Sequence, residues 1–229
     1  MTHPIRIISS MATRQLLADL VAEFQKTSAQ EVHVESVGGV DAAKRVKDGE
    51  AFDVVALAAN AIDQLTDAGK IVPGSRVDLV KSGVAIAVRA GAPRPNIGSE
   101  EAVRKAVLAA KSLSYSTGPS GVQLAKLFER WGIAEQIKDR IVQAPPGVPV
   151  GSLVADGKVE LGFQQLSEMM NLPGIDVLGP LPPEIQIITT FSAGLSVTST
   201  QPDAVRTMLD FMVSPASAEP KRRNGMEPA

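Results

Sequence analysis

Short segments rich in serine and glycine precede amphipathic stretches that are typical of helices, at residues 9–13, 37–41, 116–121 and 147–151. A helix N-terminus presents free backbone N–H groups, and its dipole favours a negative charge. For any one segment, helix capping and turn formation explain the residues as well. Their recurrence favours an anion-binding site. The residues that we expect to contact the ligand are Ser9, Ser10, Met11, Arg14, Gly38, Gly39, Val40, Ser116, Ser120, Gly121, Val148, Gln164 and Gln165.

The kind of anion follows from what surrounds these turns. Neither GxGxxG nor GxxxxGK[ST] occurs, so nucleotide binding lacks its usual signatures. Hydroxyls and helix ends suit a compact oxyanion or a small carboxylate. Arg14, Arg89 and Arg94 are candidates for bidentate pairing with a carboxylate, with solvated surface positions as the alternative. Gln164 and Gln165 directly follow a buried strand, where amides select polar ligands or cap a helix.

Catalytic groups are few. The only histidines are His3, near the N-terminus, and His33, in an expected strand, and neither is a plausible partner for Ser9, Ser10 or Ser120, so a nucleophilic triad is not expected. Proton transfer by Asp41, Glu168 or a serine stays open. The sequence therefore leaves both the catalytic residue and the question of enzymatic activity unassigned.

Composition excludes several other classes of function. The 229 residues include 23 Lys plus Arg against 25 Asp plus Glu, a net charge of −2 that argues against nucleic-acid binding. No apolar run reaches the roughly 18 residues of a membrane span. The absence of cysteine excludes disulfides and thiolate metal sites, and two histidines leave little for zinc, so we expect no metal and no cofactor.

The N-terminal sequence lacks the charged start, apolar stretch and cleavage site of a secretory signal. The expected location is the cytoplasm, or the periplasm if a leader has been removed.

Apolar runs alternate with amphipathic stretches, which is the pattern of βαβ units. In the first part we expect strands at 6–9, 32–37 and 53–57 and helices at 13–25, 41–47 and 61–68, which form a parallel sheet. In the second part we expect strands at 84–88, 113–116 and 159–163 and helices at 101–110, 121–131 and 148–155. Residues 174–184 are expected to form a loop with a brief strand at Val177. A long strand at 185–197 and a helix at 203–212 follow, and the polar last ten residues are expected to be the end of a final helix plus a tail.

These elements predict a two-lobe α/β protein with mixed sheets flanked by helices. Lobe 1 is expected to contain residues 1–82 and 188–229, and lobe 2 residues 83–187. Ligands favour the crevice between such lobes.

The order of these pieces resembles the periplasmic molybdate-binding protein family, which has the type 2 solute-binding fold. The similarity spans nearly the whole chain. It rests on the Ser10 turn, the Gly38–Gly39 turn, and residues 52–56, 58–60, 83–88 and 159–165.

The resemblance implies an oxyanion held by two serine turns in one lobe and by backbone amides plus a tyrosine in the other. Ser10 matches the first serine turn, but Gly38, Gly39 and Val40 replace the second, and Gln165 stands at the tyrosine position. These departures favour a larger organic anion, a di- or tricarboxylate, over molybdate. The family also implies a receptor that delivers its ligand to a membrane permease, if the protein is exported.

An aconitate isomerase is similar to this same family. Two hypotheses follow: a receptor or sensor for a small anion, or an isomerase that shifts a proton on a small unsaturated carboxylate.

Overall fold

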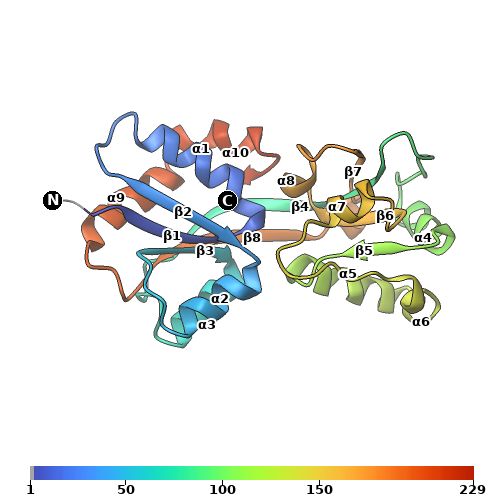
Figure 1. Ribbon diagram of the computed structural model, residues 1–229, viewed down its shortest axis with the longest axis horizontal. Coiled ribbons are helices and arrows are strands. Elements are labelled where there is room, and N and C mark those ends of the chain that lie inside the picture. The colour runs from blue at the N-terminus through green and yellow to red at the C-terminus, as the bar shows by residue number, and fades with distance from the viewer. Residues whose placement is uncertain (1–2) are drawn as a thin grey trace. The chain divides into compact units, whose positions relative to one another are not determined.

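The computed structural model describes residues 3–229, which divide into two compact units. Unit 1 comprises residues 3–82 with Thr190–Ala229, and unit 2 comprises Gly83–Thr189. Strands β4 (Val77–Arg89) and β8 (Ile188–Leu195) carry the chain from one unit to the other. Each unit has its own sheet with helices on both faces (Figure 1).

Unit 1 begins with parallel strands and the helices between them. These are β1 (Ile5–Ser10), α1 (Arg14–Phe24), β2 (Val32–Val37), α2 (Gly39–Lys47), β3 (Val54–Ala58) and α3 (Ala59–Asp67), with a 3₁₀ turn at Met11–Thr13. β1 pairs in parallel with β2 and β3, and β8 pairs antiparallel with β3. The C-terminal part adds α9 (Pro202–Val213), a 3₁₀ turn (Pro215–Ser217), α10 (Ala218–Arg223) and β9 (Glu227–Pro228). β9 pairs with β4.

Both faces of the central strands of unit 1 are covered, so β3 is apolar throughout and β1 is exposed only at Arg6. Successive side chains of a strand point to opposite faces. Ile7 accordingly joins the cluster beneath α1 and α9, and Ile8 joins the one beneath α2 and α3. Figure 1 shows these two helix pairs on opposite faces of the sheet. A continuous apolar run is the sequence pattern of such a strand, and the parallel sheet predicted for this part of the chain is confirmed.

Unit 2 is built around the second half of β4. Its other strands are β5 (Leu113–Tyr115), β6 (Leu161–Gln165) and β7 (Ile175–Pro180). Its helices are α4 (Glu100–Ala109), α5 (Pro119–Arg130), α6 (Ala134–Ile137), α7 (Val150–Ala155) and α8 (Leu166–Met169), with 3₁₀ turns at Lys138–Arg140 and Pro183–Ile185. β5 and β6 run parallel, whereas β4 is antiparallel to both β6 and β7.

Close packing of α7 on the sheet depends on a small residue in β6. A Cβ atom added at Gly162 would lie 2.5 Å from Cγ2 of Val154 and 3.0 Å from Cγ1 of Val150. Both valines belong to α7, and they pack with Ala85 and Ala87 of β4. The short side chains on this face let the helix approach the backbone of β6. This contact positions the N-terminus of α7 beside the end of that strand.

Some expected element boundaries are wrong. Residues 175–180 form a full strand rather than a loop with a brief strand, because β7 pairs along β4 despite its glycine and proline. The register shifts between Ile86 and Ala87, opposite Gly179, whose φ of +139° suits glycine. β4 begins at Val77 rather than at residue 84, and the polar tail contains β9. Within the described residues, no helix is both long enough and apolar enough to cross a membrane.

Candidate functional site

The predicted ligand residues of unit 1 lie at one edge of its sheet. Ser10 and Val37, which end β1 and β2, are opposite each other in the parallel register. The carboxyl ends of parallel strands meet at the same edge, where open α/β sheets bind ligands. A Cβ atom added at Gly39 would lie 3.5 Å from Cβ of Ser10, so the two turns are in contact.

The serines that end β1 differ in their hydrogen bonding. The Ser9 hydroxyl lies 2.7 Å from the Ser36 hydroxyl on β2. Ser10 stands at the N-cap of the 3₁₀ turn, but its side chain makes no capping hydrogen bond. Ser10 is only 7% exposed, and its Oγ is buried without a hydrogen-bond partner among the described residues. An unpaired buried hydroxyl costs stability, so Ser10 has the hydrogen-bonding capacity that a ligand would use.

The N-terminus of α2 lies beside Ser10. Gly38 is the N-cap, and the first backbone bond of the helix runs from the Ala42 N–H to the Gly38 carbonyl. The preceding N–H groups of α2 have no partner within the helix and stand at its positive end. Met11 is half-buried, and Val40 and Arg14 are exposed. This set of groups can hold a carboxylate.

The predicted residues of unit 2 also converge on one edge, where the parallel strands β5 and β6 end. Tyr115 pairs with Phe163 in register, so Ser116 and Gln164 follow at the same edge. The start of α7 is there too, since the Val150 N–H donates to Oε1 of Gln164 at 2.8 Å.

Two helix starts in unit 2 differ from expectation. α5 begins at Pro119, which puts Ser120 and Gly121 inside its first turn, where both are buried. The expected start at residue 121 is wrong because proline is favoured at the first helical position. α7 begins at Val150, and Val148, at 38% exposure, precedes it.

Gln165 is 3% exposed, and its Nε2 donates to Oγ1 of Thr189 at 2.9 Å. Its Oε1 is buried without a partner among the described residues. A hydroxyl both donates and accepts, so a half-turn of the amide keeps the bond to Thr189 and presents the NH₂ instead. Gln165 can therefore offer either an acceptor or a donor at this edge.

Glu168, in the first turn of α8, is the carboxylate of this edge. Its Oε1 accepts a hydrogen bond of 2.8 Å from Nε2 of Gln164. Burial raises the pKa of Glu168 to about 7, and the hydrogen bond from Gln164 only partly opposes that rise. Asp41, the other acidic residue considered from the sequence, is exposed in the first turn of α2. The structure thus distinguishes the buried carboxylate of Glu168 from the exposed one of Asp41, which the sequence alone did not.

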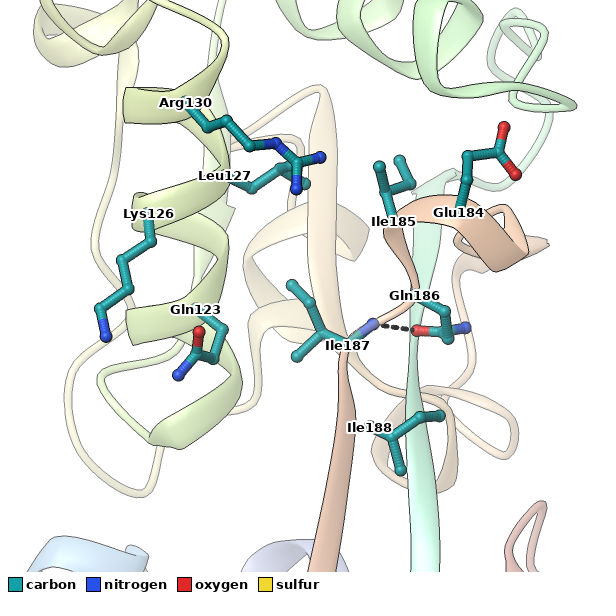
Figure 2. Close-up of a pocket in the computed structure, with 9 residues that line it drawn as sticks. All are labelled: Gln123, Lys126, Leu127, Arg130, Glu184, Ile185, Gln186, Ile187 and Ile188. Carbon is teal, nitrogen blue, oxygen red and sulfur yellow. Dashed lines mark hydrogen bonds between the residues drawn. The ribbon is translucent and has the colours of Figure 1, made fainter.

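A pocket of about 410 Å³ lies elsewhere in unit 2. Figure 2 shows it between one face of α5 and the segment that leads into β8. Two of its polar groups are already paired: Arg130 binds Glu100 at 2.8 Å, and Oε1 of Gln186 accepts from the Val84 and Ile187 N–H groups. None of the predicted ligand residues lines it. Its lining residues are Gln123, Lys126, Leu127, Arg130, Glu184, Ile185, Gln186, Ile187 and Ile188.

Two residues that complete these edges carry no signal in the sequence. Ser36 forms a hydrogen bond with Ser9, 27 residues away in sequence, and Thr189 forms one with Gln165, 24 residues away. Only strand register brings them into place. Within residues 3–229, no cluster of three or more His, Asp or Glu side chains is arranged to hold a metal ion.

The sequence of this chain is similar to those of known proteins. Residues 5–227 match the family of bacterial extracellular solute-binding proteins. An aconitate isomerase of a Pseudomonas species is 33% identical over 98% of this chain and 87% of its own length.

Solved structures agree with this fold. The periplasmic molybdate-binding protein of Azotobacter vinelandii is similar with a TM-score of 0.80 and 18% identity, over 97% of this chain and 98% of its own. The sulfate-binding protein of Mycobacterium tuberculosis has a TM-score of 0.80 and 16% identity, over 99% of this chain and 88% of its own. The two-lobe type 2 fold and the resemblance to molybdate-binding proteins are both confirmed.

Proposed function

This chain belongs to the family of bacterial extracellular solute-binding proteins, and from that premise we propose that it binds a small unsaturated tricarboxylate of the aconitate class and shifts a proton on it. The observation that carries the proposal is the 33% identity to an aconitate isomerase over 98% of the chain. The polar groups at the two sheet edges support it.

The proposed reaction moves one proton and one double bond. A base removes a proton from the methylene carbon next to the double bond, and the electron pair spreads over the three-carbon allylic system and its carboxylates. The proton then returns to the former vinyl carbon, so the double bond shifts and the cis and trans isomers interconvert. The step consumes no oxidant or reductant. It needs a base of suitable pKa and groups that stabilise carboxylates as charge develops on them.

Groups that can stabilise a carboxylate lie at the sheet edge of each unit, taken by itself. Unit 1 offers the unpaired Ser10 hydroxyl and the free N–H groups that begin α2. Unit 2 offers the N-terminus of α5 and, after a half-turn of the amide that leaves its oxygen on Thr189, the NH₂ group of Gln165. These are neutral donors, which suit a carboxylate, and the glycines at positions 38 and 39 leave room for one larger than a tetrahedral oxyanion.

A second candidate is a receptor that binds the same class of anion without converting it and passes it to a membrane permease. The family match favours this role, because its description is that of a solute-binding protein.

Calorimetry and turnover together test the proposal. The purified protein is titrated with trans-aconitate, with the saturated analogue tricarballylate and with molybdate, and incubated with each aconitate isomer. We expect both tricarboxylates to bind more tightly than molybdate, and aconitate to isomerise. Binding without isomerisation would favour the receptor. Tightest binding of molybdate would overturn the assignment of a carboxylate ligand.

Replacing Ser10 with alanine is expected to weaken tricarballylate binding about 5- to 10-fold, the value of one hydrogen bond. The melting temperature without ligand should not fall, because the lost hydroxyl has no partner in the protein. Ser82→Ala is the matched control: it removes another buried, unpaired hydroxyl, on β4, outside the proposed turns. Equal affinities of S10A and the wild type in calorimetry would remove Ser10 from the site.

A further inference from the structure

We propose that the carboxylate of Glu168 is the general base that takes and returns the proton, an inference that rests on the proposed isomerase function. The residue lies at the edge of unit 2 where β6 ends and α8 begins. Gln164, Gln165 and the start of α7 meet at this same edge.

The Gln164 amide holds one oxygen of Glu168 in a single orientation. A backbone N–H is only a donor, so the Val150 N–H requires the amide oxygen of Gln164, at 2.8 Å. The NH₂ of the same amide must then face Glu168, and it donates to Oε1 at 2.8 Å. Gln164 itself is 3% exposed and cannot turn toward water. The carboxylate is therefore oriented by an amide that the helix start fixes in place.

The other oxygen of Glu168 is uncommitted. Among the described residues, the carboxylate of Glu168 accepts one side-chain hydrogen bond, at Oε1, and none is found at Oε2. A general base needs an accessible lone pair within hydrogen-bond distance of the proton that it removes. Glu168 is half-buried, so this oxygen combines partial access with low solvation. Asp53, the buried carboxylate of unit 1, differs because both of its oxygens accept hydrogen bonds, from the Arg6 N–H and from Ser199.

The surroundings of Glu168 contain little charge. The strand β6 and the helix α7 carry no charged side chain, and β7 contributes only Asp176. Asp176 accepts from the Gly91 N–H at 3.2 Å and lies 4.0 Å from Arg94. With no cation to stabilise its anion, burial dominates and places the pKa of Glu168 at about 7. A base is most effective when its pKa is near the working pH.

The proposed proton transfer needs only one protein residue, because the group that removes the proton also returns it. The carboxylate of Glu168 accepts the methylene proton and becomes a carboxylic acid, while the substrate becomes an allylic carbanion. The same acid then donates the proton to the other end of the allylic system, and both partners regain their starting charge. One base can serve both carbons if they lie on the same side of the bound substrate.

The test compares the wild type with Glu168→Gln, which keeps the length of the side chain and an oxygen for the Gln164 amide. We expect E168Q to lose about 100-fold or more of the isomerisation rate, with tricarballylate affinity in calorimetry essentially unchanged. The wild-type rate should rise with pH through about 7, since only the ionised carboxylate accepts a proton. Glu129→Gln, at an exposed position of α5, is the control and should keep full activity.

The outcomes separate the two proposals. An E168Q protein that keeps more than about a tenth of the wild-type rate would overturn the role of Glu168 and leave the isomerase function standing. A wild-type rate that is flat between pH 6 and 8 would also overturn that role. A wild type that binds aconitate without converting it would overturn the isomerase function, and with it any base. Should E168Q fail to bind tricarballylate, Glu168→Asp takes its place, with a rate lowered by displacement of the carboxylate but still rising with pH.

Discussion

Replacing Gly121 with alanine is expected to lower the free energy of unfolding by about 3 kcal/mol. A Cβ atom at this position would lie 1.8 Å from the Ser116 carbonyl oxygen and 2.8 Å from its carbon. Both are backbone atoms of the turn that joins β5 to α5, so no side-chain rotation relieves the overlap. The first turn of α5 would have to move away from the end of β5, at the edge that carries Ser116 and Ser120.

Urea unfolding measures this effect, with Gly39→Ala as the control. Gly39 also begins a helix after a strand, but a Cβ atom there would meet only Cβ of Ser10, at an ordinary 3.5 Å. We expect the stability of G39A to stay within about 0.5 kcal/mol of the wild type. A G121A protein that unfolds at the same urea concentration as the wild type would contradict the close approach of α5 to the Ser116 turn.

Replacing Glu168 with glutamine is expected to stabilise the protein at alkaline pH. The pKa of Glu168 is about 7 in the folded protein, against 4.5 for an ordinary glutamate. Burial thus favours the protonated form, and the folded state loses stability as pH rises from 4.5 through 7 and the carboxyl ionises. Glutamine is never charged and avoids this loss. The stability gained should be close to zero at pH 4.5 and reach about 2 to 3 kcal/mol above pH 7.

Thermal unfolding of E168Q, E129Q and the wild type at pH 5 and pH 8 measures the difference. Only E168Q should gain stability over the wild type between these two pH values, because Glu129 is exposed. If the E168Q gain were the same at both pH values, the burial of the Glu168 carboxylate would not govern its ionisation. If E168Q both gains stability at pH 8 and loses turnover, Glu168 is a residue that serves activity and lowers the stability of the folded protein.

The fold was predictable from the sequence wherever both faces of a strand are covered. The run at Val54–Ala58 is apolar throughout and forms β3, and Ile5, Ile7 and Ile8 mark the other central strand, β1. β7 was not predictable in full because its positions are only half-buried and it contains Gly179 and Pro180. Its strand conformation comes from pairing with β4, which no local pattern of residues 174–184 reports.

The candidate site was predictable in its turns but not in its pairings. Serine and glycine after an apolar run mark helix starts, and α2 begins within the predicted turn, at Gly39 rather than at residue 41. What separates Ser10 from Ser9 is the partner of each hydroxyl, which depends on the register of β1 against β2. Likewise Glu168 stands out from Asp41 only through its burial and the Gln164 amide. Local chemistry is visible in the sequence, whereas solvation is set by the tertiary structure.

Proton NMR of the wild-type protein with cis-aconitate in one sample and trans-aconitate in another tests the central claim most directly. We predict that both samples converge on the same ratio of isomers, because a catalyst speeds both directions and leaves the equilibrium unchanged. E168Q should leave each sample as prepared over the same time. Unchanged spectra with the wild type, at a protein concentration at which calorimetry shows the aconitate bound, would contradict the account.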